Sequence, residues 1–304
     1  MIYDIIIAGA GAAGMNCALY ALRSGKTVLI LEGEAVGGQI ANSPKVENFP
    51  TIKEISGSEF ADKFYEQITG WGAELEYDKV TKVVKGDDGL FHVRTEYGNY
   101  TSKAFVAAVG VRHRHLRVPG EAELIGNGVY FCALCDGPFY KDREVAVIGD
   151  GNTAMQYTVI LSGICSKVYV LTLTDKFFGD KVLEKRMKEK PNVVHIPNVS
   201  VTEFVGTNKL ESIKYKNVGS NEVFSLDVPA AFVSIGQVPD NKIFAELASL
   251  DEQGYFICAD DGSTDTPGFF VAGDCRAKKI RQLATAVSDG AVAALAACEY
   301  IDKL

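Results

Sequence analysis

The sequence predicts an α/β fold with two Rossmann-like units, because the same order of elements occurs twice. Residues 3–34 and residues 143–175 each have the pattern of a strand, a glycine turn, a helix of small apolar residues and a second strand. Near the end, residues 266–301 add a strand, a loop that opens at Gly273–Asp274 and a helix that begins near Gln282. The repeated order is typical of doubly wound α/β domains.

Both glycine turns have the spacing of a nucleotide-binding turn. The first, "GAGAAG" at residues 9–14, fits G-x-G-x-x-G, and the second, "GDGNTA" at residues 149–154, fits G-x-G-x-x-A. Glycines at this spacing let the backbone approach a pyrophosphate at the N-terminus of a helix. One such motif is weak evidence alone, but two in strand–turn–helix context predict two nucleotide-type domains.

Composition restricts the class of protein. Of the 304 residues, 47% are hydrophobic and 23% are charged, an ordinary globular balance, and the formal net charge of −8 argues against nucleic acid as a partner. The apolar residues 1–14 lack a basic leader and a cleavage site, so they predict a buried strand and not a signal peptide. No apolar run is predicted to span a bilayer. The odd count of seven cysteines favours a reducing cytoplasm.

The chain has a single C-x-x-C motif, Cys132 and Cys135 in "FCALCDGPFY". This spacing lets two thiols form a disulfide, and a nearby helix start or positive charge favours a reactive thiolate. Half of a zinc site is the alternative, with His113 and His115 upstream as candidate ligands. However, no second C-x-x-C is present and no closed-site spacing is met, so we favour redox chemistry and expect no metal.

Seven motifs in order carry a resemblance to a known family. They are "GAGAAG", "GGQIANSPKVENFP", "VPGE", "CALCDG", "GDGNTA", "FVSIGQVPD" and "GDCRAKKIRQLATAVSDGAVAA". Over almost its full length the chain resembles the low-molecular-weight thioredoxin reductases. The resemblance implies an FAD domain from both ends of the chain, 1–114 and 241–304, and an inserted NADPH-domain-like module, 115–240, which carries the cysteines. It also implies a homodimer that passes electrons from FAD to the cysteine pair and then to thioredoxin.

The resemblance assigns positions to the FAD site. Gly9, Gly11 and Gly14 match the pyrophosphate turn, and Glu32, 23 residues after Gly9, matches the carboxylate for the adenosine ribose. Asp274 is expected on the ribityl or pyrophosphate side. The last helix, opening at Gln282, directs its positive end at the flavin. The full set of expected positions is Gly9, Gly11, Ala12, Ala13, Gly14, Glu32, Gly38, Gln39, Asn48, Gly110, Gly273, Asp274, Arg281, Gln282 and Ala284.

The resemblance also assigns roles in the redox motif. Cys135 matches the thiol that faces the flavin, and Cys132 matches the thiol that attacks the thioredoxin disulfide. Asp136 matches the general acid/base, a role that requires burial to raise the pKa of its carboxyl. A helix N-cap is the structural alternative for Asp136, and it is compatible with the catalytic role.

The second unit departs from the family where a pyridine nucleotide is held. Thr172 lies 23 residues after Gly149, where NAD-binding units place a carboxylate and NADP-binding units place arginines. Family members that use pyridine nucleotides carry a His-Arg-Arg-type cluster there and another arginine shortly after. Here residues 172–174 are Thr-Leu-Thr, and Phe178 or Gly179 stands near the later arginine.

The glycine turn of the second unit departs as well. Asp150 stands between its glycines, and residues 156–157, Gln-Tyr, replace the usual acidic residue. A carboxylate near a pyrophosphate is repulsive. Lys176, Lys181 or Asp175 remain alternative contacts for a nucleotide. We nevertheless expect the second unit to be a scaffold and not a cofactor site.

Electrons must then come from another donor. The missing motifs match the ferredoxin-dependent flavin thioredoxin reductases, so reduced ferredoxin is the expected donor. Ferredoxins are acidic, and two basic runs offer a docking surface: Arg112, Arg114 and Arg117, and Arg276, Lys278, Lys279 and Arg281. Four alternatives remain open: an NADPH-dependent thioredoxin reductase, a dithiol oxidase that uses oxygen, a redox-sensing flavoprotein, and reduction by a deazaflavin.

Overall fold

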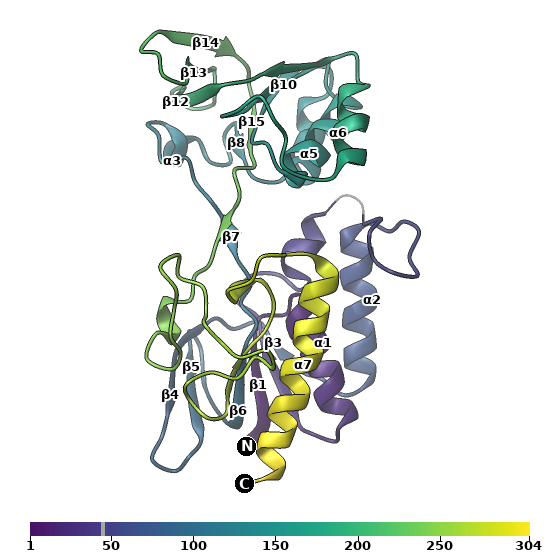
Figure 1. Ribbon diagram of the computed structural model, residues 1–304, viewed down its shortest axis with the longest axis vertical. Coiled ribbons are helices and arrows are strands. Elements are labelled where there is room, and N and C mark those ends of the chain that lie inside the picture. Colours follow the sequence, from purple (N-terminus) through teal and green to yellow (C-terminus); the bar gives the residue numbers. More distant parts are fainter. Residues whose placement is uncertain (44–45) are drawn as a thin grey trace. The chain divides into compact units, whose positions relative to one another are not determined.

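A computed structural model describes residues 1–43 and 46–304, which leaves positions 44–45 of the "GGQIANSPKVENFP" motif outside the description. The chain divides into two compact units, one formed by residues 1–112 and 238–304 and the other by residues 113–237 (Figure 1). These limits lie two to three residues before the expected 114/115 and 240/241 boundaries. The predicted α/β class, with a discontinuous first domain and an inserted second one, is confirmed.

The first unit is built on a seven-stranded sheet with the order β3-β2-β1-β6-β5-β4, in which β17 also pairs with β6. Strand β1 runs parallel to both β2 and β6. The strands are β1 (Ile2–Ala8), β2 (Val28–Leu31), β3 (Glu74–Glu76), β4 (Val80–Lys85), β5 (Phe91–Thr95), β6 (Asn99–Ala107) and β17 (Phe269–Val271).

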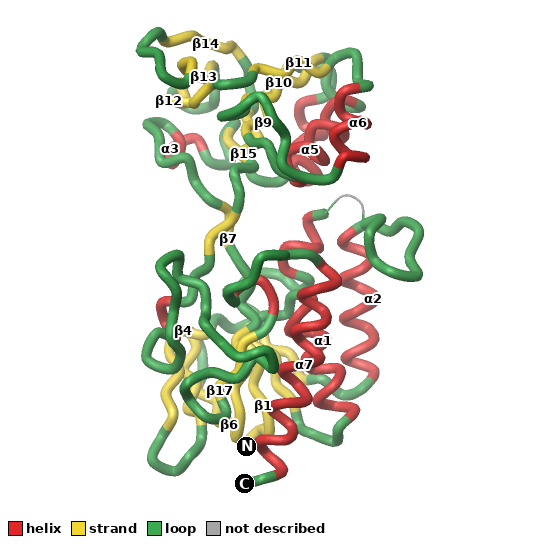
Figure 2. The backbone as a smooth tube through the Cα atoms, in the orientation of Figure 1, coloured by secondary structure: helices red, strands yellow, loops and turns green. Residues whose placement is uncertain are grey.

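Alternation along β1 gives the sheet two apolar faces. Ile5 and Ile7 pack into a core with α1 (Ala12–Arg23), α2 (Gly57–Gly70) and α7 (Leu283–Asp302). Figure 2 shows these three helices side by side on one face of the sheet. Ile6 and Ala8 point to the opposite face, into a core with the β4–β5 region and the 3₁₀ helix η3 (Lys242–Phe244).

Helix α7 corrects one expectation. By length and composition alone it could cross a bilayer, although no apolar run was predicted to do so. One such helix is weak evidence for a membrane span, and α7 packs in part against the core of the first unit. It buries Ala293, Ala294 and Ala297 against the core that also contains α1. A Cβ on Gly290 of α7 would lie 2.1 Å from the carbonyl oxygen of Ala13, so the glycine permits the close approach.

The second unit repeats the design with a five-stranded parallel sheet of order β11-β10-β9-β15-β8. One face packs against α5 and α6, and the other packs against a three-stranded antiparallel sheet. The elements are β8 (Val129–Tyr130), β9 (Glu144–Ile148), α5 (Asn152–Ser162), β10 (Lys167–Leu171), α6 (Lys181–Lys188), β11 (Val193–Ile196), β12 (Val199–Val205), β13 (Ser212–Asn217), β14 (Val223–Asp227) and β15 (Ala231–Val233).

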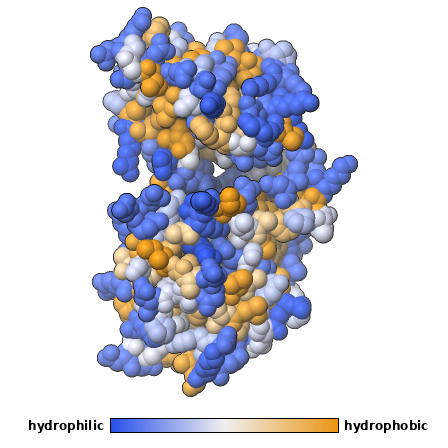
Figure 3. Space-filling view, viewed as in Figure 1, coloured by the Kyte–Doolittle hydropathy of each residue, from blue (hydrophilic) through white to orange (hydrophobic). Residues whose placement is uncertain are grey.

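Short elements complete the chain. The two crossings between the units, β7 (Arg112–His113) and β16 (Gln237–Val238), pair with each other. The others are the helical turns α3 (Glu121–Leu124) and α4 (Ala133–Asp136) and the 3₁₀ helices η1 (Gly38–Asn42), η2 (Gly137–Tyr140) and η4 (Gly273–Cys275). Figure 3 shows hydrophilic residues over much of the visible surface of each unit, with apolar residues scattered among them.

Candidate active site

The first glycine turn has the shape that a pyrophosphate needs. Gly9 has a left-handed φ of +103°, and a Cβ there would lie 2.5 Å from the carbonyl oxygen of Ala108. A Cβ on Gly14 would lie 1.9 Å from the Gly9 carbonyl oxygen, whereas one on Gly11 would face open space. The first turn of α1, which includes Ala12 and Ala13, has no acidic residue and no side-chain cap. Its backbone N–H groups therefore suit an anionic group.

Glu32 lies beside this turn. It follows β2, its side chain is buried, and its carboxylate accepts hydrogen bonds from the backbone N–H of Ala10 and of Glu34, both at 2.7 Å. The two hydrogen bonds hold a carboxylate at the strand end, where a ribose is bound in such folds. The position of Glu32 is the one expected from the sequence.

Loops from both ends of the chain meet at the start of α7. The amide of Asn48 donates to Oε1 of Gln282 at 3.1 Å, across 234 residues of sequence. Gln282 and Thr285 form a capping box that begins the helix, with Ala284 exposed in its first turn. The amide of Gln39, in η1, donates to the carbonyl oxygen of Val111 at 3.3 Å.

Three glycines shape the surrounding loops with left-handed backbones, namely Gly38, Gly110 and Gly273, whose φ values are +55°, +62° and +83°. Gly38 packs on the first glycine turn, because a Cβ there would lie 3.3 Å from the Cα of Gly11. A Cβ on Gly273 would lie 2.8 Å from the Cβ of Ala13. The loop before α7 thus lies against the first glycine turn.

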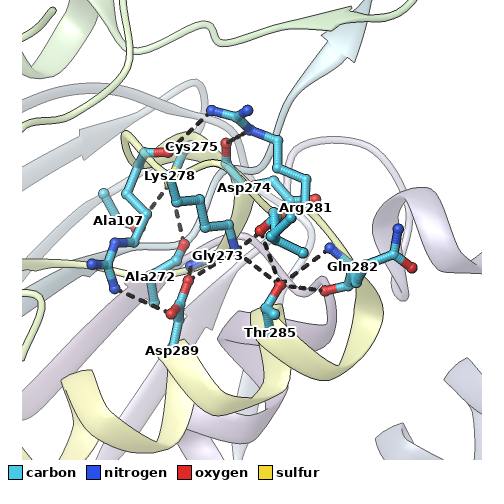
Figure 4. Close-up of polar contacts among 12 residues, drawn as sticks. Ala107, Ala272, Gly273, Asp274, Cys275, Lys278, Arg281, Gln282, Thr285 and Asp289 are labelled. Atoms are coloured by element: carbon cyan, nitrogen blue, oxygen red, sulfur yellow. Dashed lines mark hydrogen bonds and ion pairs between the residues drawn. The ribbon is translucent and has the colours of Figure 1, made fainter. Parts of the chain in front are cut away.

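Asp274 is held in a network of charged side chains (Figure 4). Its Oδ1 lies 3.0 Å from Nζ of Lys278, and its carbonyl oxygen accepts a hydrogen bond from Nε of Arg281 at 3.2 Å. Oδ1 is buried and makes no aligned hydrogen bond within the described part of the chain. Besides its ion pair with Lys278, this carboxylate oxygen has a further lone pair for a donor such as a ribityl hydroxyl, which fits FAD.

The same network corrects the expected basic surface at residues 276–281. Arg276 and Lys278 are largely shielded from solvent and pair with Asp289, and the guanidinium of Arg281 stacks at 3.9 Å over the ring of Tyr255. Of the four cations in this run, Lys279 alone is exposed. In the other run, Arg112 pairs with Glu34 and Asp240, while Arg114 and Arg117 are exposed.

The redox motif lies on the short turn α4 of the second unit. Cys132 and Cys135 form a disulfide with a Cα–Cα distance of 5.4 Å, as the motif predicts. Sγ of Cys132 also accepts a hydrogen bond from the backbone N–H of Cys135 at 3.1 Å. Cys135 is exposed and Cys132 is half-buried. The rings of His113 and His115 pack on Phe131, and the described residues contain no cluster of three potential metal ligands.

Asp136 lies next to the disulfide in a half-buried position. Burial raises the pKa of its carboxyl. Burial, and secondarily the charge of Asp136, raise the pKa of the Tyr157 phenol to about 12. Although Asp136 precedes η2, its side chain makes no capping hydrogen bond to that turn. A carboxyl with a raised pKa holds its proton to higher pH than an exposed carboxyl does, as a general acid beside a thiol pair requires.

The second glycine turn is covered by the segment that follows β10. The backbone N–H of Phe178 donates to the carbonyl oxygen of Asp150 at 2.8 Å, and that of Asp180 donates to Oδ1 of Asn152 at 2.7 Å. Helix α5 begins without a side-chain cap, as α1 does. The turn geometry of the repeat is therefore intact, but its neighbours differ.

No arginine is present where β10 ends. Thr172 is buried, and its hydroxyl contacts His195 and the carbonyl oxygen of Thr174. Leu173 and Phe178 are 59% and 61% exposed. Lys176 and Lys181 are both exposed, and Lys181 pairs with Glu184 at 2.7 Å. Three carboxylates, Asp150, Asp175 and Asp180, belong to the turn and the segment that covers it.

Comparisons with known proteins assign the family. The model for the pyridine nucleotide-disulphide oxidoreductases matches residues 3–290. A thioredoxin reductase from Treponema pallidum is 39% identical over 99% of this chain and 98% of its own. The chain belongs to the low-molecular-weight thioredoxin reductase family. Like other members, this thioredoxin reductase is a flavin-dependent oxidoreductase that uses FAD.

Two solved structures of the family are informative. The thioredoxin reductase of Lactococcus lactis has a TM-score of 0.96, with 35% identity, and the match covers 99% of this chain and 100% of that one. The ferredoxin-flavin thioredoxin reductase of Clostridium acetobutylicum has a TM-score of 0.54 with 28% identity, and the match covers 99% of each chain.

Sequence reasoning missed Asp289 and misjudged Lys278. Asp289 is the one charged residue in the stretch "LATAVSDGAVAALAAC" of α7. A single carboxylate among small apolar residues, one to two turns after Gln282, indicates a buried partner. That pattern is visible in the sequence, but the partner is not.

Proposed function

We propose that this thioredoxin reductase takes its electrons from reduced ferredoxin and not from NADPH. The observation that carries the proposal is the end of β10, where buried Thr172 and exposed Leu173 and Phe178 stand in place of cations. A 2′-phosphate binds where arginines can neutralise it. The exposed apolar side chains provide neither charge nor hydrogen bonds for it.

The charges around the second glycine turn oppose a pyrophosphate. Asp150, Asp175 and Asp180 outnumber Lys176, the one exposed lysine there that is not paired. Two like charges 4 Å apart repel by about 1 kcal/mol in water, and by more where solvent is excluded. We infer that this unit is retained because it carries the redox disulfide.

NADPH dependence is the second candidate. The more similar relatives, including those from T. pallidum and L. lactis, are named thioredoxin reductase without mention of ferredoxin. The α5 turn also retains its glycine geometry. The C. acetobutylicum enzyme supports ferredoxin at lower identity. We expect the charges around the second glycine turn, and not the overall sequence identity to relatives, to decide between NADPH and ferredoxin as the donor.

The described residues of the first unit fit FAD, and we propose that they hold it. Gly9, Gly11 and Gly14 with the first turn of α1 suit the pyrophosphate, Glu32 suits the adenosine ribose, and Asp274 suits the ribityl chain. We expect Gln39, Asn48 and Gln282 to lie near the flavin ring, because Asn48 contacts Gln282 at the start of α7 and Gln39 contacts Val111. When bound, FAD accepts single electrons and delivers them in pairs.

The dithiol half of the reaction is assigned to the second unit. In the reduced enzyme the Cys132 thiolate attacks a sulfur of the thioredoxin disulfide, forms a mixed disulfide and releases one thioredoxin thiolate. The Cys135 thiolate then attacks Sγ of Cys132, which restores the enzyme disulfide and releases the second thiolate. Asp136 supplies a proton to one released thiolate and solvent supplies a proton to the other, so thioredoxin leaves as the dithiol.

Docking of an acidic ferredoxin requires exposed cations. In the two basic runs, the exposed cations for which no ion pair is described are Lys279 in the first unit and Arg114 and Arg117 in the second. We also propose that the protein is a homodimer and that it is cytoplasmic. Sedimentation of the purified flavoprotein tests the dimer directly.

Steady-state assays with thioredoxin test the donor. The holoenzyme is supplied in turn with NADPH, with NADH, with chemically reduced ferredoxin and with a reduced deazaflavin, and new thioredoxin thiols are counted. Turnover with ferredoxin alone supports the proposal, and turnover with NADPH contradicts it. A Cys135→Ser enzyme is the control, because every productive route requires the dithiol. Oxygen consumption with a dithiol substrate would indicate a dithiol oxidase. No turnover with any donor would indicate a redox-sensing flavoprotein.

A further inference from the structure

We propose that Lys278 is a positioning residue of the flavin site: its ammonium group holds and neutralises the Asp274 carboxylate beside the cofactor. The inference rests on the proposed place of Asp274 at FAD, and it is independent of the electron donor. A bare carboxylate next to a pyrophosphate is repulsive, so a carboxylate in this place needs a countercharge.

The geometry around Lys278 is that of a bridge between two carboxylates. Nζ lies 3.0 Å from Oδ1 of Asp274 and 2.9 Å from Oδ2 of Asp289. It also lies 3.4 Å from Oγ1 of Thr285, a member of the capping box of α7. The side chain of Lys278 is 12% exposed, so the ammonium is directed inward (Figure 4). Such a buried cation is held by several partners at once, unlike a surface lysine.

Asp289 fixes this bridge to the scaffold. Its Oδ2 accepts a hydrogen bond from the backbone N–H of Gly273 at 3.2 Å, and its Oδ1 pairs with Nη1 of Arg276 at 3.1 Å. Gly273 lies against Ala13, in the first turn of α1. The Asp289 carboxylate on α7 thus holds the backbone of Gly273 and the ammonium group of Lys278 in place. Through Lys278 it also positions the Asp274 carboxylate.

The charges of the network balance. Asp274 and Asp289 are opposed by Arg276 and Lys278, and all four side chains are largely buried. Removing the lysine charge leaves the network with one excess negative charge beside an anionic cofactor. Reduced flavin as an anion carries one more negative charge than oxidised flavin. Loss of the Lys278 charge should therefore weaken the binding of reduced FAD more than the binding of oxidised FAD.

The test compares FAD binding by apoproteins of five variants: Lys278→Met, Lys278→Arg, Asp274→Asn, the double variant Asp274→Asn/Lys278→Met, and Lys279→Met. Lys279 is the exposed neighbour of Lys278 and serves as the matched control. Quenching of flavin fluorescence gives Kd, equilibration with a reference dye gives the flavin midpoint potential, and urea denaturation of each apoprotein reports folding.

Lys278→Met is expected to weaken FAD binding at least tenfold, while Lys278→Arg and Lys279→Met change it little. In Lys278→Met, the binding of reduced FAD should weaken tenfold more than the binding of oxidised FAD. That difference lowers the midpoint potential of the bound flavin by about 30 mV. In the Asp274→Asn background, most of the effect of Lys278→Met disappears.

Two outcomes overturn the positioning role. One is an equal loss in both backgrounds, which means that Lys278 acts without Asp274. The other is a lowered denaturation midpoint with unchanged Kd and potential, which means that the network serves stability alone. If Asp274→Asn leaves Kd unchanged, the place of Asp274 at FAD fails with it, while the donor proposal is unaffected.

Discussion

Oγ1 of Thr172 lies 2.8 Å from Nε2 of His195 and donates its proton to the carbonyl oxygen of Thr174 at 2.5 Å. Because the hydroxyl proton is used there, Nε2 of His195 is the donor between the two side chains. Burial lowers the pKa of His195, which agrees with a neutral ring. The end of β10 is therefore closed by internal hydrogen bonds at the position where a nucleotide ribose is otherwise bound.

Restoring cations at this strand end should create NADPH use. The triple change Leu173→Arg, Thr174→Arg and Phe178→Arg adds charge at exposed or half-buried positions, so the fold should tolerate it. We expect at least a tenfold rise in NADPH-driven thioredoxin reduction. NADH, which lacks the 2′-phosphate, provides the matched comparison, and an equal rise with NADH contradicts the charge argument.

The two cysteines should differ in a trapping experiment. Cys135→Ser leaves Cys132 able to attack thioredoxin but removes the thiol that resolves the mixed disulfide. A thioredoxin variant with one active-site cysteine, activated as a mixed disulfide with a chromophoric thiol, should become covalently bound to this enzyme on a non-reducing gel. Cys132→Ser is the control and should give little adduct; the reverse pattern would exchange the proposed roles.

Asp136→Asn should slow thioredoxin reduction by about 100-fold, the lower end of the range for a general acid. Because burial raises the pKa of the carboxyl, Asp136 is protonated at low pH and loses its proton as the pH rises through the raised pKa. Proton donation should decline over that window in the wild type. The decline should be absent from the kcat profile of the variant, and an unchanged profile would exclude this role.

The raised pKa of Asp136 also predicts a change in stability. A carboxyl with a higher pKa in the folded state stabilises the fold below its unfolded pKa of about 4, and this contribution is lost as the pH rises through the folded pKa. Urea unfolding at pH 4 and pH 8 should show less pH dependence for Asp136→Asn than for the wild type. Greater dependence in the variant would mean that the direction of the shift is wrong.

Gly290→Ala should destabilise the first unit by about 1–3 kcal/mol, because the new methyl group meets the carbonyl oxygen of Ala13 in a packed helix pair. Gly70→Ala is the control, since the last residue of α2 has open space for a methyl group. It should be neutral or slightly stabilising in urea unfolding. Equal stability of the two variants would contradict the close approach of α1 and α7.

The sequence predicted the parts of this structure that depend on local pattern. Glycines at residues 9–14 and 149–154 determine two turns whose backbone no other residue type adopts easily, and the spacing of Cys132 and Cys135 determines their disulfide. The basic run at residues 276–281 could not be judged in the same way. A cation is exposed or buried according to partners far away in sequence, and here the partner, Asp289, is the one charged residue in the first sixteen residues of α7.

Anaerobic mixing of the oxidised holoenzyme with a donor tests the central claim most directly. The absorbance of oxidised flavin is followed after addition of excess NADPH, excess NADH or reduced ferredoxin in separate samples. We predict rapid loss of absorbance with ferredoxin, reduction of added thioredoxin afterwards, and no loss with either nicotinamide. Prompt loss with NADPH would contradict the account and would show that the segment after β10 binds a pyridine nucleotide without arginines.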